Sequence, residues 1–287
     1  MAPQRVRADL RLDGQARTIA ATRLAGAFTL NETKKSGGNL PDRGSDSCAL
    51  ARLLAAVVAL GCLTAAPQCV ASDLWGGSLA LTSDYFVRGI SRSDDRAALQ
   101  LDLHYMNTSG FLAGLFASNT QIDPSEPRDA ELSAFLGYVW SPGSDWHGKI
   151  LGTHYSYPWN RAGSQYNYDE VDLEVVYRGW LDLRLVYSPD SPRYMQYRYP
   201  VAVSAESAEL GVQRPLVGKL SGNAGIGYYY LQGSNASGYT YGSAGATYDW
   251  GLLSVAVSYV RTSAAANALF YNAAVGGRWA GTVIWRF

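Results

Sequence analysis

Apolar and polar positions alternate with a period of two over many short stretches of the chain after Ala71. In one stretch Ala97, Leu99, Leu101, Leu103 and Tyr105 alternate with Ala98, Gln100, Asp102, His104 and Met106. Residues 171–178 and 181–188 repeat the pattern. This period is typical of strands with one apolar and one polar face. Because no helical window exceeds two turns, we predict an all-β chain.

Twelve such segments are predicted, and their connections alternate between long and short. The segments are 76–88, 96–106, 111–120, 130–140, 146–157, 168–178, 181–188, 203–213, 219–231, 239–249, 252–261 and 271–287. Strict alternation over an even strand count is typical of a closed up-and-down outer-membrane β-barrel with short periplasmic turns. A soluble β-sandwich has no reason to keep that parity. The pattern therefore predicts an antiparallel transmembrane barrel of about twelve strands with both termini periplasmic.

The last stretch is aromatic-rich on one face. Trp279, Gly281, Val283, Trp285 and Phe287 alternate with Ala280, Thr282, Ile284 and Arg286. A sheet in hydrocarbon must close, because each unpaired backbone group there costs several kcal/mol. We therefore expect the last strand to pair with the first. Trp285 and Phe287 are expected at the periplasmic interface as the C-terminal barrel-assembly signal, in a belt with Tyr138, Trp140, Trp146, Trp180 and Trp250 near short turns.

Composition changes near residue 72. All 20 Tyr and all 8 Trp lie beyond Ala71, whereas the 3 Cys lie before it. Residues 72–287 therefore offer no disulfide or cysteine-based zinc site, and no metal or cofactor is predicted. The first 71 residues carry 9 Lys and Arg against 5 Asp and Glu, and the rest carry 15 against 19. A mildly acidic body is a poor nucleic-acid binder.

Residues 50–71 are typical of a secretory signal peptide. Arg52 precedes an apolar run, and small residues follow at 67–71. The run is shorter than the roughly 20 residues of a transmembrane helix. Residues 1–49 are polar and basic without strand periodicity. They are either a mis-assigned start, with translation beginning near Leu50, or a disordered extension. The barrel is predicted to span residues 72–287.

The segment LTSDYFVRGIS, at Leu81–Ser91, resembles the opening motif of the TorF-type porin family, a group of conserved proteobacterial β-barrel proteins. The matching residues are Thr82, Ser83, Asp84, Tyr85, Arg88, Gly89 and Ser91; the order of Phe86 and Val87 departs from the family's pattern. The stretch His154–Pro158 is a weaker second similarity. The resemblance implies a Gram-negative outer-membrane barrel regarded as a porin by fold, with no assigned substrate and no catalytic residues.

Charged residues on the polar faces are predicted to line the lumen. The candidates for the lumen or its constriction are Asp84, Arg88, Asp102, His104, Glu174 and Arg184. If strand one runs to Arg88, Tyr85 and Val87 face lipid, and Gly89 lets the chain turn. Arg88 then acts as a constriction charge or, as we favour, in a structural ion pair with a neighbour such as Asp102. A three-residue turn at 178–180 would set Glu174 opposite Arg184 or Arg178 opposite Asp182.

These features predict a porin-like channel for passive diffusion of small solutes. The acidic excess favours cations or neutral molecules. The expected partners are outer-membrane lipid, lipopolysaccharide, the barrel-assembly machinery and small solutes, without nucleic acid. One alternative is a plugged barrel that serves as an anchor or adhesin through its long loops. The other is an outer-membrane hydrolase of lipids or esters that uses His154 and Ser156, which share a strand face; the sequence identifies no third, orienting group, so an enzyme is not favoured.

Overall fold

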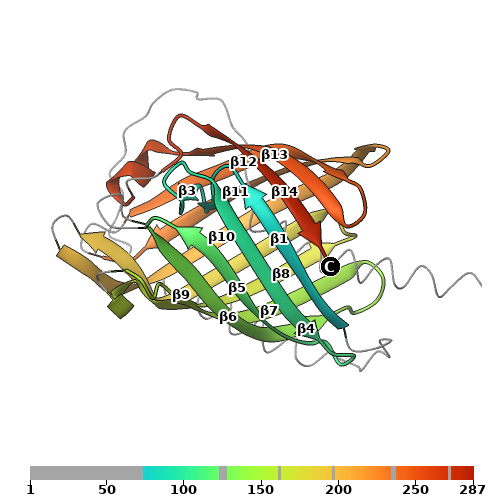
Figure 1. Cartoon of the computed structure of the whole chain (residues 1–287), viewed down its shortest axis with the longest axis horizontal. Helices are drawn as coiled ribbons and strands as arrows, with labels where there is room; N and C mark the ends of the chain where they lie inside the picture. The colour runs from blue at the N-terminus through green and yellow to red at the C-terminus, as the bar shows by residue number, and fades with distance from the viewer. Residues whose placement is uncertain (1–73, 123–127, 161–162, 196–197, 234–236, 271–272) are drawn as a thin grey trace, which may run out of the picture.

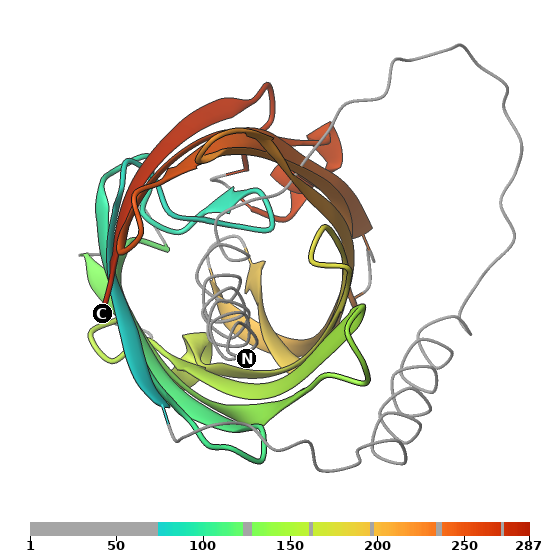
Figure 2. The same cartoon turned by 90° about the vertical axis from the view of Figure 1, so that its right-hand side faces the viewer.

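The computed structural model describes residues 74–122, 128–160, 163–195, 198–233, 237–270 and 273–287. The predicted extension at 1–49 and signal peptide at 50–71 lie outside these residues. Twelve antiparallel strands form a closed barrel (Figures 1 and 2). The strands are β1 (Leu74–Thr82), β4 (Ala98–Met106), β5 (Phe111–Thr120), β6 (Asp129–Trp140), β7 (Trp146–Ser156), β8 (Tyr168–Tyr177), β9 (Leu181–Met195), β10 (Arg198–Val217), β11 (Leu220–Leu231), β12 (Ser237–Asp249), β13 (Leu253–Thr262) and β14 (Arg278–Arg286). The predicted all-β barrel and its strand number are confirmed.

Four smaller elements among the described residues lie in long connections, at the end of the barrel opposite the short turns. A two-stranded sheet is formed by β2 (Phe86–Val87) and β3 (Ile90–Ser91), and two short 3-10 helices are η1 (Gly163–Tyr166) and η2 (Ala264–Ala268). Within the residues that the structure describes, no helix is long and apolar enough to cross a membrane.

The barrel closes where the first strand pairs with the last. The β1–β14 register runs from Ser78 opposite Arg286 to Thr82 opposite Thr282. Beyond it, Gly77 and Phe287 exchange two backbone hydrogen bonds of 3.0 Å. The predicted pairing of the first and last strands is therefore confirmed, and the backbone of Phe287 is held at the seam.

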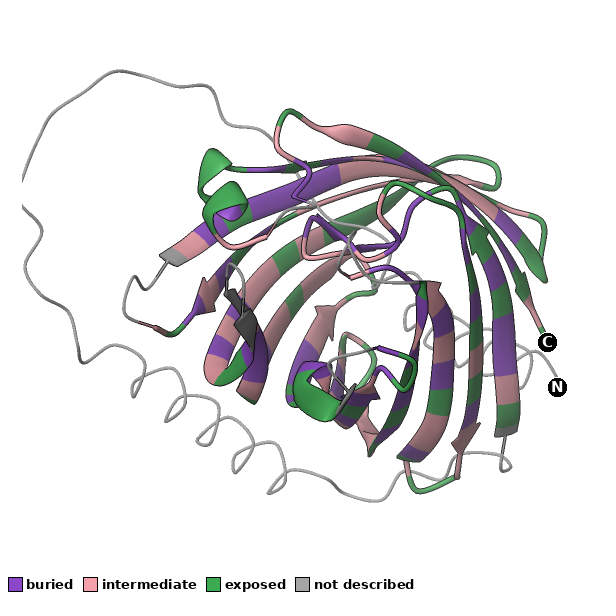
Figure 3. Ribbon diagram, turned by 60° about the vertical axis from the view of Figure 1, so that its left-hand side comes forward, coloured by how far each residue is buried: buried purple, intermediate pink, exposed green. Residues whose placement is uncertain are grey.

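The two faces of the wall differ as the alternation predicts, which Figure 3 shows as alternating exposed and buried bands along the strands. On β4, Leu99, Leu101 and Leu103 are exposed on the outer face, whereas Ala98, Gln100 and His104 are buried on the inner face. On β14, Trp279, Val283 and Trp285 are exposed, and Ala280, Thr282 and Ile284 are buried. The exposed apolar belt is the surface that a bilayer covers.

Aromatic rings gather at the end of the barrel that carries the short turns. The neighbouring pairs there are Trp75–Tyr105, Tyr138–Trp140, Trp146–Tyr177, Tyr248–Trp250 and Trp285–Phe287. Rings at this level match an interfacial girdle, because their apolar bodies and polar edges suit the boundary between lipid and water. The sequence prediction of such a belt near the short turns is confirmed.

Several predicted strand limits are wrong. The expected loop from Pro189 to Ala202 is instead largely strand, because β9 continues to Met195 and β10 begins at Arg198. In this extension β9 and β10 pair only with each other, because their pairing with β8 and β11 ends at Tyr187 and Ala205. The prolines of the extension therefore lie on edges of the sheet, where proline's lack of an N–H breaks no ladder. The last barrel strand begins at Arg278 rather than at residue 271.

A proline in the seam tests the closure. Val283 on β14 lies opposite Leu81 of β1 and Val255 of β13. Val283→Pro removes a ladder N–H inside hydrocarbon, which costs several kcal/mol. We expect the variant to lose the compact, fast-migrating band on gels of unheated samples. Val283→Ala keeps the backbone donor and should retain the band; a compact band in the proline variant would contradict the seam.

Candidate functional site

The segment after β1 folds into the barrel instead of continuing the wall. Figure 2 shows β2 and β3 as a hairpin inside the ring of strands. Arg88 and Gly89 form its tip with φ of +50° and +74°. The prediction that Tyr85 faces lipid is wrong, because Tyr85 is 1% exposed and lies inside. The predicted turn at Gly89 is confirmed.

Asp84 closes the base of this hairpin. Its carboxylate accepts hydrogen bonds from Ser91 Oγ at 2.6 Å and from Ser93 Oγ at 2.9 Å. The hydroxyl of Ser93 in turn accepts the N–H of Tyr85 at 2.9 Å. Burial raises the pKa of the Asp84 carboxyl above its ordinary value, against the two serine hydrogen bonds, which lower it. Asp84 therefore ties the two arms of the hairpin together and does not project freely into the lumen.

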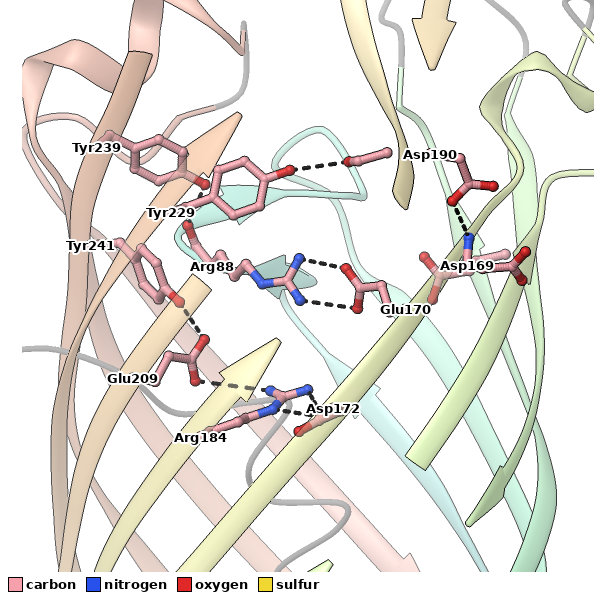
Figure 4. Close-up of polar contacts among 12 residues, drawn as sticks. Arg88, Asp169, Glu170, Asp172, Arg184, Asp190, Glu209, Tyr229, Tyr239 and Tyr241 are labelled. Carbon is pink, nitrogen blue, oxygen red and sulfur yellow. Dashed lines mark hydrogen bonds and ion pairs between the residues drawn. The ribbon is translucent and has the colours of Figure 1, made fainter. Parts of the chain in front are cut away.

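Arg88 fastens the tip to the far wall, as Figure 4 shows. Its two terminal nitrogens donate to Glu170 of β8 at 2.7 and 3.0 Å, and the side chains are only 8% and 4% exposed. Burial lowers the pKa of the Arg88 guanidinium, but Glu170 outweighs it and holds that pKa well above its ordinary value. The guanidinium also lies 5.4 Å from the Tyr229 ring centre, and Tyr239 Oη donates to the Arg88 carbonyl at 3.0 Å.

Further contacts hold the hairpin on other sides. Tyr85 Oη donates to Glu131 of β6 at 3.0 Å. The N–H of Ala274 donates to the Gly89 carbonyl at 3.0 Å. A Cβ on Gly89 would lie 2.4 Å from Cγ2 of Thr262, so the tip packs against β13 too closely for any side chain. The motif therefore has one structural role, which is to form the hairpin and hold it in the lumen; the residues that do so are Asp84, Tyr85, Arg88, Gly89 and Ser91.

Three successive inward carboxylates on β8 each bind a cation from a different direction. Glu170 binds Arg88 from the hairpin, Asp172 binds Arg184 from β9, and Glu174 binds Lys149 from β7 at 2.7 Å. Arg184 also lies 3.9 Å from Glu209 of β10, which accepts the hydroxyl of Tyr241. These contacts therefore involve the hairpin and strands β7, β8, β9, β10 and β12, and Figure 4 shows those made by Arg88, Arg184 and Glu209.

The predicted register of β8 and β9 is confirmed, since Glu174 lies opposite Arg184. The two charges nevertheless bind other partners: Lys149, directly opposite Glu174 on β7, donates to its carboxylate, and Arg184 binds Asp172. Arg178 bonds Asp145 in a neighbouring turn, not Asp182.

Asp102 and His104 form a separate pair at 2.6 Å on the inner face of β4. The expected contact between Arg88 and Asp102 is therefore wrong, because the hairpin carries Arg88 to Glu170. The sequence missed Glu170, although it shares the polar face of Asp172 and Glu174. It also missed Tyr229 and Tyr239, whose role appears only when the hairpin enters the lumen.

Charge is distributed unevenly around the inner wall. On the described part of β4–β8, inward carboxylates outnumber the inward lysine, Lys149. The carboxylates are those of Asp102, Asp129, Glu131, Glu170, Asp172 and Glu174. The hairpin brings Arg88 and Arg92 towards this acidic wall. Among the described residues, no group of three or more His, Cys, Asp and Glu side chains is placed to hold a metal ion.

A closed barrel with an apolar exterior, an aromatic girdle and a charged interior defines an outer-membrane β-barrel of the porin type. The chain belongs to the family described as "Bacterial protein of unknown function (Gcw_chp)", whose model matches residues 70–285. A comparison with curated proteins finds no match.

The chain is similar to solved porin structures at low sequence identity. The KdgM porin is 12% identical, with 74% of this chain and 99% of that one covered and a TM-score of 0.48. The NanC porin is 8% identical, with 74% and 98% covered and a TM-score of 0.48. A complex of KdgM with disordered oligogalacturonate is 11% identical, with 74% and 98% covered and a TM-score of 0.47.

Gly89→Val tests the docking of the hairpin. The substitution places a branched side chain at a positive φ and against Thr262, so the tip should leave its site. We expect trypsin to cut the folded variant after Arg88 and Arg92, bonds that resist cleavage in the parent protein, as read by mass spectrometry. Gly281→Ala, which meets nothing within 4 Å, is the control and should behave as the parent. Equal resistance of all three proteins would argue against a docked tip.

Proposed function

We propose that residues 72–287 form a narrow outer-membrane channel for the passive passage of small solutes, constricted by the hairpin of β2 and β3. The observation that carries this proposal is the buried bidentate pair of Arg88 and Glu170, which holds a loop across a charged interior. In this proposal residues 50–71 direct secretion and are removed, and residues 1–49 are not part of the mature barrel.

The inner wall suits water and polar solutes better than an inert core. A barrel that only needed filling would be more stable with apolar side chains, because buried ion pairs lose much of their attraction to desolvation. Here the wall keeps three neighbouring ion pairs, in which Glu170, Asp172 and Glu174 of β8 bind Arg88, Arg184 and Lys149. A polar interior within an apolar exterior is the arrangement of a channel.

The charge on the wall favours cations or neutral molecules over anions. Carboxylates dominate β4–β8, and Asp102, with His104, lies apart from the hairpin network. Rings of acidic side chains raise the local concentration of cations and lower that of anions. The hairpin arginines act against this bias at the constriction, so selectivity should be moderate. We place Asp84, Arg88, Asp102, His104, Glu174 and Arg184 among the residues that shape the passage.

The aromatic girdle and the loop lengths support an orientation of the barrel in the membrane. We place the short turns and both barrel termini in the periplasm and the long loops outside a Gram-negative cell. Trp285 and Phe287 at the seam are then the signal that the barrel-assembly machinery reads. Lipid and lipopolysaccharide contact the exposed apolar belt.

Glu170→Gln tests the constriction. The substitution leaves the Arg88 guanidinium buried without its carboxylate, at a cost of about 3–5 kcal/mol. The hairpin should therefore leave the lumen, and single-channel conductance of the purified protein in planar bilayers should rise severalfold. Arg88→Gln should have the same effect, and the double variant should add little to either single change.

The outer-face variant Glu206→Gln is the matched control, because Glu206 lies between the inward residues Ala205 and Ser207 on β10. It should conduct as the parent does. If the parent and Glu170→Gln are both silent, the barrel is plugged and the anchor or adhesin alternative is favoured.

Glu174→Gln and Asp102→Asn test the selectivity. Each removes one negative charge from the acidic wall, so the reversal potential in a salt gradient should move towards that of a non-selective pore. Glu206→Gln removes a charge from the outer face and should leave the reversal potential unchanged. A parent protein that prefers anions would contradict the assignment of the wall.

A further inference from the structure

We propose that His154, Ser156 and Asp169 form a lipid-facing esterase site on the outer face of β7 and β8, which cleaves acyl esters of membrane lipids. This activity is separate from the channel. The orientation proposed above decides only which leaflet of the membrane supplies the substrate.

The base and its orienting acid are already in contact. His154 Nδ1 lies 2.8 Å from Asp169 Oδ1, where the two residues face each other on β7 and β8. A carboxylate only accepts hydrogen bonds, so Nδ1 carries the proton and Nε2 is left as the basic nitrogen. This is the tautomer that a general base requires. The orienting group that the sequence did not identify is therefore Asp169.

The pair is held in place from two sides. Asp190 of β9 accepts the backbone N–H of Asp169 at 2.8 Å, a contact visible in Figure 4. On the inner face Tyr155 and Tyr168 stack at 4.5 Å with an interplanar angle of 9°. The stack fixes the two strands at the level of the pair. His154 and Asp169 remain about half exposed, with side-chain exposures of 54% and 59%.

The nucleophile stands on the same strand. Ser156 follows His154 by two residues, so both side chains project from the outer face, roughly 7 Å apart along the strand. Its hydroxyl donates to the Leu132 carbonyl at 2.9 Å in this structure. The proposed reaction requires rotation about the Cα–Cβ bond of Ser156, which turns the hydroxyl from the Leu132 carbonyl towards His154. Such contacts often tighten only when substrate binds.

A glycine lies next to these groups, one step nearer the short turns, between two exposed apolar side chains. Gly152 occupies the next outward position on β7, between Leu136 of β6 and Val171 of β8. A Cβ on Gly152 would meet only the Leu136 carbonyl, at 4.0 Å, and the two flanking side chains are 62% and 39% exposed. In the proposed site an acyl chain lies over Gly152, between these two apolar side chains. The polar groups lie at the edge of the apolar belt, where ester groups of lipids reside.

The proposed reaction is acyl transfer to serine and then to water. Ser156 Oγ attacks the ester carbonyl carbon while His154 Nε2 takes the hydroxyl proton. The bond to the leaving alcohol breaks, and His154 returns the proton to that alcohol. Water then attacks the acyl-enzyme, again giving its proton to His154. The carboxylic acid product leaves as Ser156 regains the proton from His154, and the acid then releases its remaining proton to water, so atoms and charge balance.

The experiment uses the full protein in detergent with a fluorophosphonate probe, phospholipid vesicles and lipopolysaccharide as separate substrates. We expect the probe to label Ser156 and free fatty acid to be released. Ser156→Ala and His154→Ala should each lower the rate by about 100-fold or more, and Asp169→Asn by at least about tenfold. The substrate that is hydrolysed distinguishes phospholipid from lipopolysaccharide as the source of the ester.

Ser141 supplies the matched control, because its hydroxyl lies 2.9 Å from His147 Nδ1 near the short turns. Ser141→Ala should keep both labelling and hydrolysis. Compact bands of unheated samples show that each outer-face variant is folded. The proposal is overturned if folded parent protein neither labels nor hydrolyses either lipid, if labelling survives in Ser156→Ala, or if Asp169→Asn acts at the rate of the parent.

Discussion

The whole structure depends on one constraint, which is that backbone N–H and C=O groups in hydrocarbon need partners within the chain. The pairing of β1 with β14 meets this constraint by removing both edges of the sheet. Once the sheet is closed, each strand has one face towards lipid and one towards the interior. Leu99 and Leu101 can therefore be exposed on a stable protein, and Gln100 between them can be buried.

Closure also creates an interior in which the buried charges of β8 are paired. Along β8, Glu170, Asp172 and Glu174 are each neutralised by a cation from another element. The hairpin is part of this arrangement, because Arg88 is the partner of Glu170. Loss of either member leaves a buried charge, which costs far more than the intact pair contributes. The constriction and the stability of the inner wall are thus coupled through one ion pair.

The sequence predicted the strands, their faces, the seam and the aromatic belt, because each rests on period-two alternation that lipid enforces. It did not predict the hairpin, since residues up to Arg88 continue the alternation of β1. The chain leaves the wall where the hydroxyls of Ser91 and Ser93 donate hydrogen bonds to the Asp84 carboxylate. These contacts join residues seven and nine positions apart, which the alternation of neighbouring residues does not reveal. Likewise, Asp169 became a candidate only once the β7–β8 register set it opposite His154.

Alternation also lets one strand serve two surfaces. On β8, Asp169 points outward to His154, and the next residue, Glu170, points inward to Arg88. A slip of one residue in the β7–β8 register would exchange these faces, so both sites need the same register. The inner pair of Lys149 and Glu174 and the stack of Tyr155 on Tyr168 hold that register. The charged interior therefore positions the outer pair of His154 and Asp169 as well as the constriction, although the pair faces lipid and the constriction faces the lumen.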